Sequence, residues 1–269
     1  MSAVPFQALL EGQDAKGCCA SLYEAEPVRW LLGGELHPGG ERLTRRTAEL
    51  ADLGGARVVD VASGAGASAQ LLAGELGAEV VGVELGAAAV QRARAAAHQA
   101  GLGERVSFRE GDAEALPLPD ASVDAALCEC SLCVFPSKAT AVAEMARVVR
   151  PGGVLAISDV VADVQALPPS LRSPAARVAC VADALSEPAL VELLEHGGLE
   201  LIVRERHDAE LAAMIDRVEA RLRVARMLAV PALESFRGDI AAAVELARAA
   251  KEAVADGRLG YGIVVARRP

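Results

Sequence analysis

Short apolar runs alternate with longer stretches of helical periodicity through the middle of the chain. The apolar runs are rich in valine and end at turn residues, so they predict strands, whereas the alanine-rich stretches between them predict helices. The predicted strands are residues 57–61, 79–83, 106–109, 123–127 and 154–158, and the predicted helices are residues 67–76, 87–100 and 140–149. Strands and helices that alternate with short connections are typical of a doubly wound parallel sheet with right-handed crossovers.

The pattern changes after Asp159. Residues 160–187 contain three prolines and predict a cap or lid, with residues 164–174 exposed. Further predicted elements are helices at 43–53, 188–195, 209–228 and 240–255 and strands at 200–206 and 261–266. We therefore expect a helical N-terminal preface (1–55), a cofactor-binding core (56–160), a cap or lid (161–199) and a C-terminal part (200–269) that completes the sheet.

Composition narrows the class of protein. The 269 residues carry 27 basic and 37 acidic side chains, a net charge of −10, and 52% of them are hydrophobic. The apolar content excludes a disordered chain, and the negative charge disfavours nucleic-acid binding. The sequence shows neither a secretion signal nor an apolar stretch long enough to span a membrane. We expect a cytoplasmic protein with a small-molecule substrate, no nucleic-acid or membrane partner and six reduced cysteines; its oligomeric state is left open.

A glycine pattern follows the first predicted strand. Residues 64–69, Gly-Ala-Gly-Ala-Ser-Ala, satisfy the G-x-G-x-x-A form that lets a backbone approach a ligand at a helix N-terminus. Glu84 ends the second predicted strand, 18 residues after Gly66, where its carboxylate can accept hydrogen bonds from ribose hydroxyls. Together these features indicate an adenosine-type cofactor. Ordinary turn chemistry and a nicotinamide enzyme are the alternatives.

Later landmarks in the chain favour one family over these alternatives. From Arg57 to Asp159 the sequence resembles class I S-adenosylmethionine-dependent methyltransferases, through the first motif, the ribose acid, the adenine-contacting segment at 111–114 and the turn at 150–153. The resemblance implies a Rossmann-like seven-stranded α/β sheet and S-adenosylmethionine as cofactor. It assigns cofactor contacts to Asp60, Ala62, Gly64, Gly66, Glu84, Asp112, Ala113 and Cys128. Ala62 departs from the family, which usually has glycine at this position.

Three cysteines, Cys128, Cys130 and Cys133, lie at the end of the fourth predicted strand. Ligands of open α/β sheets bind at the carboxyl ends of the strands, and thiolates favour soft metals and metalloids. Cys128 and Cys130 share a face if strand geometry continues through Glu129. The alternatives are buried structural cysteines and a structural zinc, although Cys-x-Cys-x-x-Cys is not a standard zinc spacing.

Here the likeness narrows to arsenite methyltransferases. Residues 122–130 resemble that family's fourth-strand motif, and residues 180–185 resemble its lid motif. The resemblance implies that Cys130 and Cys180 are catalytic arsenic ligands, and that Cys19, in the N-terminal pair Cys18–Cys19, is a third. Departures include Cys133, where the family often has asparagine, and the chain from about residue 209 onward.

The expected function is methyl transfer from S-adenosylmethionine to a thiol-bound trivalent arsenical, arsenite or methylarsenite. Two alternatives stay open at this point. One is an enzyme of the same fold that methylates carbon, nitrogen, oxygen or sulfur of another small metabolite. The other is a non-catalytic protein that binds a soft metal or metalloid.

Overall fold

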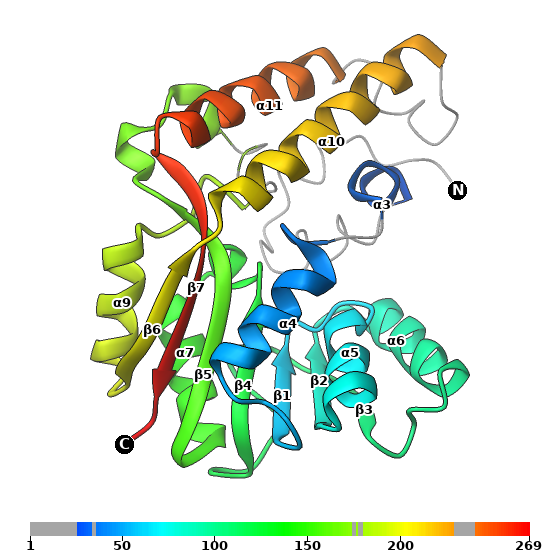
Figure 1. The fold of residues 1–269 in the computed structure, drawn as a ribbon, viewed down its shortest axis with the longest axis vertical. Coiled ribbons are helices and arrows are strands. Elements are labelled where there is room, and N and C mark those ends of the chain that lie inside the picture. Colours follow the sequence, from blue (N-terminus) through cyan, green and yellow to red (C-terminus); the bar gives the residue numbers. More distant parts are fainter. Residues whose placement is uncertain (1–25, 34–35, 174–175, 177–179, 229–239) are drawn as a thin grey trace.

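A seven-stranded sheet forms the centre of the molecule in the computed structural model (Figure 1), which describes residues 26–33, 36–173, 176, 180–228 and 240–269. The strands are β1 (Arg57–Val61), β2 (Glu79–Glu84), β3 (Val106–Glu110), β4 (Val123–Glu129), β5 (Val149–Ala162), β6 (Glu200–Arg206) and β7 (Leu259–Arg267), in the order β3-β2-β1-β4-β5-β7-β6. The first five run parallel, and β7 pairs antiparallel with both β5 and β6. The predicted Rossmann-like seven-stranded sheet is confirmed, but the last strand runs against its neighbours.

Helices cover both faces of the sheet and enclose two apolar cores. The first face is covered by α4 (Gly40–Leu50), α5 (Ala67–Leu76) and α6 (Ala87–Gln99), and the second by α7 (Lys138–Val148) and α9 (Glu187–His196). Helix α11 (Ile240–Ala255) lies beyond the ends of the strands and contributes side chains to the first core. Because the chain has few aromatic residues, small aliphatic side chains fill these cores, and the fully buried Tyr261 is an exception. Among the described helices, none is long and apolar enough to cross a membrane.

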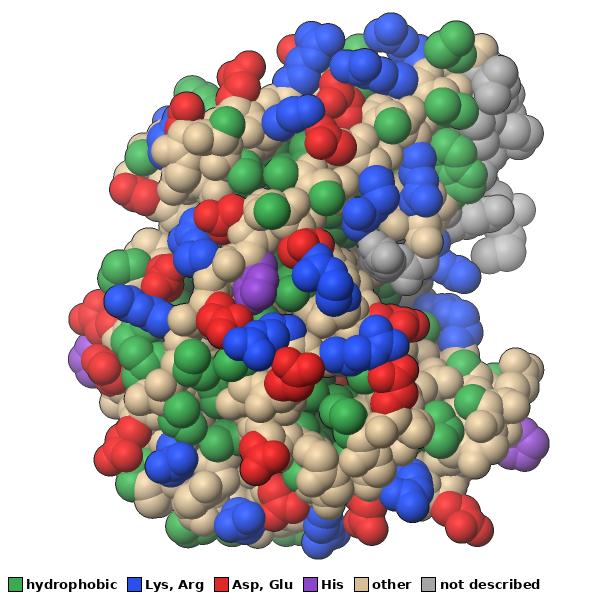
Figure 2. Space-filling model, in the orientation of Figure 1, with side chains coloured by type: hydrophobic (Ala, Val, Ile, Leu, Met, Phe, Trp, Pro, Cys, Tyr) green, Lys and Arg blue, Asp and Glu red, His purple; other side chains and the backbone are tan. Residues whose placement is uncertain are grey.

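Two further helices lie beyond the carboxyl ends of the parallel strands. Helix α10 (Asp208–Leu228) runs beside α11 and contacts α3 (Glu26–Leu32), as Figure 1 shows. On the face seen in Figure 2, acidic and basic side chains are interspersed. Ion pairs hold α4 in place: Arg45 Nε lies 2.7 Å from Glu75 Oε2 on α5, and Arg46 Nε donates to Glu205 Oε2 on β6 at 3.0 Å.

The segment predicted as an exposed lid is anchored in the core. After β5 the chain forms 3-10 helices at Val164–Ala166 and Pro169–Arg172. Leu167 and Leu171 are 2% and 0% exposed, so the expectation of an exposed segment is wrong at these positions. Strand β5 is also longer than predicted, because residues 159–162 pair with β7 beyond the charged Asp159 that ends the apolar run.

The turn after β1 contains a strained residue. Ala62 has φ 58°, in the left-handed region where a Cβ atom crowds the following carbonyl oxygen. This explains why glycine is usual there in the family that the sequence resembles. With Ala62 in this conformation, the chain turns sharply after β1, and residues 63–66 lead directly into α5, whose N-cap is Gly66.

Substituting Ala62→Gly should therefore stabilise the fold by about 1 kcal/mol, because glycine relieves the left-handed strain. The matched control is Ala95→Gly on the exposed face of α6, which should destabilise by about 1 kcal/mol. Chemical denaturation of the two variants measures both changes. A loss of stability in Ala62→Gly equal to that of the control would contradict the assigned strain.

Candidate functional site

A large cleft opens at the carboxyl ends of β1, β2, β3 and β4. Its volume is about 1230 Å³, above the roughly 300–1,000 Å³ typical of small-molecule pockets. Its lining includes the turn after β1 and residues of α3, α4 and α10. This volume can hold a nucleoside-sized cofactor together with a second substrate.

Six of the predicted cofactor contacts line this cleft: Asp60, Ala62, Gly64, Glu84, Asp112 and Ala113. Glu84, 9% exposed, also braces the glycine turn. The backbone N–H of Gly64 donates to Glu84 Oε2 at 2.9 Å, and that of Gly86 donates to Oε1 at 2.8 Å. One carboxylate thus fixes the turns that follow β1 and β2.

Gly66 does not line the cleft but is required for packing. It caps α5 with φ 81°, and a Cβ atom there would lie 2.4 Å from the ring of Phe108. Its role in the structure is close approach of the turn to β3. A glycine pattern alone does not separate this packing role from a direct ligand contact.

Cys128 also lies outside the cleft lining. Its side chain is fully buried in the core beneath α7 and α9, whereas Cys130 packs against the opposite core and reaches the cleft. The expectation that the two share a face is wrong, because β4 ends at Glu129 and Cys130 turns away with φ 50°.

Asp60, at the carboxyl-terminal half of β1, has an unsatisfied oxygen. It is 3% exposed, and its Oδ2 has no hydrogen-bond partner. Burial raises the pKa of Asp60 well above its usual range, and the nearby Glu129 and Glu84 carboxylates raise it further. A cationic group in the cleft would relieve this repulsion, so the orphaned oxygen fits a positively charged cofactor.

Glu129 is a cleft residue that the sequence analysis missed. Ser68 Oγ and Thr44 Oγ1 donate to its Oε2 at 2.5 and 3.1 Å. Ser158 Oγ lies 3.4 Å from Oε1, and His37 Nε2 lies 3.8 Å from Oε2. The available signal was an acid at the last position of an otherwise buried strand, between two cysteines.

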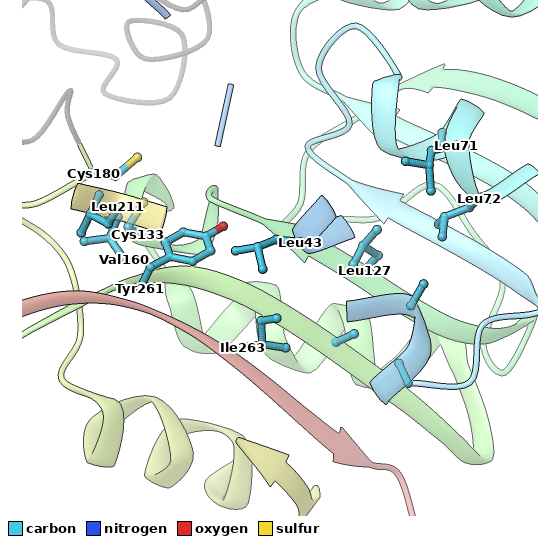
Figure 3. Close-up of a cluster of buried hydrophobic side chains, with 14 of the residues drawn as sticks. Leu43, Leu71, Leu72, Leu127, Cys133, Val160, Cys180, Leu211, Tyr261 and Ile263 are labelled. Carbon is cyan, nitrogen blue, oxygen red and sulfur yellow. The ribbon is translucent and has the colours of Figure 1, made fainter. Parts of the chain in front are cut away.

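Three thiols meet beside the cleft; we call Cys130, Cys133 and Cys180 the thiol cluster. Cys180 Sγ lies 3.8 Å from the carbonyl oxygen of Cys130, 50 residues away in the chain. Figure 3 shows Cys180 and Cys133 close together beside Tyr261. Cys130 lines the cleft, whereas Cys133 and Cys180 are each 3% exposed. Cys19 falls outside the described residues.

The thiol cluster lies in a buried, acidic environment. A hydrogen bond with Cys180 and burial raise the pKa of Cys130, and burial raises the pKa of Cys133. Asp159 accepts from the backbone N–H of Cys133 at 3.0 Å, and burial raises the pKa of Asp159 to about 7. The thiols of Cys130 and Cys133 therefore hold their protons at neutral pH. Within the described part of the chain, no group of three or more His, Cys, Asp or Glu side chains could hold a metal ion.

Removing the Glu84 carboxylate should weaken the affinity for S-adenosylmethionine by about 10- to 100-fold. The ribose hydroxyls would lose their hydrogen-bond acceptor, and the turn after β1 would lose the carboxylate that holds it in place. Isothermal calorimetry of Glu84→Ala measures the affinity, and circular dichroism checks the fold. Unchanged affinity in a folded variant would remove Glu84 from the cofactor site.

The pKa of Cys130 predicts its reactivity. The thiolate is the form of cysteine that reacts with iodoacetamide. The alkylation rate of Cys130 should therefore still rise with pH above the pH at which the alkylation rate of the unfolded chain's cysteines becomes constant, because the pKa of Cys130 is raised. Peptide-resolved mass spectrometry across a pH series, with the denatured protein as control, gives both profiles. Coincident profiles would contradict the raised pKa.

Comparisons with known proteins agree with this geometry. A family model described as a methyltransferase domain matches residues 59–157. The 27-O-demethylrifamycin SV methyltransferase of Amycolatopsis mediterranei is 32% identical over 91% of this chain and 94% of its own length. An arsenite methyltransferase of Halobacterium salinarum is 33% identical over 69% of this chain and 50% of its own length. The chain spans about half the length of several of the curated relatives that it matches.

The fold has a full-length counterpart among solved structures. The [4+2]-cyclase SpnF superposes with a TM-score of 0.79 at 23% identity, covering 100% of this chain and 99% of that one. At this identity the likeness concerns the fold alone. The full-length relative, the domain match and the cleft at the strand ends together show that the chain belongs to the class I S-adenosylmethionine-dependent methyltransferases.

Proposed function

We propose that this methyltransferase transfers the methyl group to a trivalent arsenical held by the thiols of Cys130 and Cys180. One observation carries the proposal: Cys180 lies against Cys130 beside the cofactor cleft, although 50 residues separate them in the chain. The Cys180 thiol is directed at the backbone of Cys130, and its hydrogen bond raises the pKa of the Cys130 thiol, so the two side chains are neighbours. Two such sulfurs can bind one soft metalloid.

The chemistry suits a site built from thiols. S-adenosylmethionine supplies an electrophilic methyl group, which the lone pair of trivalent arsenic can attack. The new As–C bond takes that lone pair, and the electrons of the broken S–CH3 bond stay on sulfur. Cys130 and Cys180 would orient the lone pair towards the methyl group, so that catalysis comes from positioning and requires no general base.

Protonated thiols are compatible with binding an arsenical. When an As–OH group exchanges with a cysteine thiol, the thiol proton leaves with the hydroxide as water, and no net charge enters the site. This neutral exchange matters because Cys133 and Cys180 are buried next to Asp159. A buried thiolate pair beside an acid would be costly to form before the metalloid binds.

A second candidate is methylation of a hydroxyl group on a larger organic molecule. The full-length relative from Amycolatopsis mediterranei carries the name of such an enzyme, and the cleft has room for a bulky acceptor. His37 also lines the cleft, and it could receive a hydroxyl proton. However, both ring nitrogens of His37 already face acceptors of the protein: Nδ1 lies 3.2 Å from Pro38 O, and Nε2 lies 3.8 Å from Glu129 Oε2, so neither is directed at a hydroxyl of a substrate.

The proposal is tested by incubating the protein with S-adenosylmethionine, glutathione and arsenite or methylarsenite and determining arsenic speciation. Methylated arsenicals should form in the wild type. Cys130→Ser and Cys180→Ser should each lose at least about tenfold in rate, and the double variant should be little worse, since either change destroys the same site.

The matched control is Cys128→Ser, which changes a buried cysteine on β4 that belongs to the other core of the sheet. It should keep most of the rate, and all variants should bind S-adenosylmethionine normally. If the wild type methylates no arsenical but consumes methyl donor with a hydroxylated acceptor, the second candidate replaces the first. Full arsenical activity in both thiol variants would overturn the thiol mechanism.

A further inference from the structure

Three carboxylates meet where β1, β2 and β4 end, and we call Asp60, Glu84 and Glu129 the carboxylate cluster. All three line the cleft, and all are nearly buried: Asp60 and Glu84 are 3% and 9% exposed, and the Glu129 side chain is 5% exposed. They lie close enough for Glu129 and Glu84 to raise the pKa of Asp60. The basic residues that line the cleft come from helices instead: Arg29, Arg42, Arg92 and Arg217.

Glu129 is oriented by neutral groups. The hydroxyls of Ser68 and Thr44 both donate to Oε2, and Oε1 receives a single long contact of 3.4 Å from Ser158. Hydroxyl donors fix the direction of a carboxylate without cancelling its charge. Behind it, Tyr261 donates its hydroxyl hydrogen towards Ser158 at 3.1 to 3.2 Å, which fixes Ser158 in turn. The Glu129 carboxylate is thus held in one orientation, and its Oε1 keeps spare acceptor capacity.

Asp60 supplies an independent sign that a cation belongs here. Its Oδ2 is buried and unpartnered in the cleft, although buried polar atoms are rarely left so. A second carboxylate nearby increases the cost of ionising it. A positive ligand between the two acids would satisfy the orphaned oxygen and offset the repulsion.

The position of Glu129 indicates which positive group it faces. It contacts Ser68 in the first turn of α5, next to the cofactor turn, and Thr44 on α4. The next two residues of the chain, Cys130 and Ser131, also line the cleft, and Cys130 belongs to the thiol cluster. Glu129 is therefore placed between the cofactor turn and the thiol cluster, where it can face the methyl-bearing sulfur of the cofactor.

We propose that Glu129 recognises the sulfonium charge of S-adenosylmethionine and, with Asp60, makes the site select the methyl donor over the demethylated product. The donor carries a positive sulfur that S-adenosylhomocysteine lacks, while the adenosine and amino acid portions are common to both. A carboxylate beside the sulfur therefore increases the affinity for S-adenosylmethionine and not the affinity for S-adenosylhomocysteine. Such selection limits inhibition by the product, and it holds whatever the methyl acceptor is.

Calorimetry with three ligands distinguishes the contribution of the ligand's charge to affinity from the contribution of its shape. S-adenosylmethionine and sinefungin, which carries an amine where the sulfonium methyl lies, are both cationic at this position, whereas S-adenosylhomocysteine is neutral there. In the nearly isosteric Glu129→Gln variant, affinity for the two cationic ligands should fall by about tenfold, because the interaction is poorly screened inside the cleft. Affinity for S-adenosylhomocysteine should stay within about twofold.

Two further variants keep the test decisive. Glu129→Asp retains the charge and should retain most of the preference for the cationic ligands, and Glu84→Gln should weaken all three ligands alike, because the ribose is common to them. Thermal unfolding checks that each variant is folded. Equal losses for all three ligands in Glu129→Gln, or no loss for any, would overturn the proposal. Neither result depends on arsenical methylation, so its failure is distinguishable from failure of the proposed function.

Discussion

The parallel register of three strands determines where the chemistry of this protein lies. Val61 on β1 pairs with Val83 on β2 and with Cys128 on β4. The next residues of the three segments, Ala62, Glu84 and Glu129, therefore lie at the same level, at the end of the sheet. The turn after β1 and the carboxylates of Glu84 and Glu129 become neighbours although they are far apart in the sequence. Like charges gathered in this way are costly without a cation, so the sheet itself favours a cationic cofactor.

Backbone strain accompanies this arrangement. Among the described residues, the non-glycine positions with positive φ are Asp52, Ala62, Ala121, Cys130 and Cys180. Three of these, Ala62 and the two cysteines, surround the cleft and the thiol cluster. Left-handed residues of this kind cost free energy and persist where the surrounding structure imposes them. At Cys130 the strain turns the side chain out of the β4 alternation and towards the cleft, which an extended residue would not do.

Local patterns in the sequence were sufficient to predict most of the fold. The strand and helix alternation and the glycine turn after β1 follow from short-range signals, because each depends on neighbouring residues. Most of the six cleft-lining residues that were predicted to contact the cofactor were instead anticipated through the family resemblance. The antiparallel direction of β7 could not be predicted, since the direction of a strand is a property of its partners. The burial of Leu167 and Leu171 also depends on distant packing, and proline content alone suggested exposure.

Side-chain direction was the weaker part of the site prediction. Strict strand alternation placed Cys128 with Cys130, but β4 ends one residue earlier than that argument requires. Glu129 was overlooked because its partners come from α4, α5 and β5, and no local motif connects them. The approach of Cys180 to Cys130 was anticipated through the family resemblance and not through any pattern of spacing.

The most direct test of the account is a crystal structure of the protein with S-adenosylhomocysteine and arsenite. The account predicts one arsenic atom bonded to Sγ of both Cys130 and Cys180, with its open side towards the sulfur of S-adenosylhomocysteine in the cleft. Arsenic bonded to neither thiol, or bonded at a distance from the cofactor cleft, would contradict it.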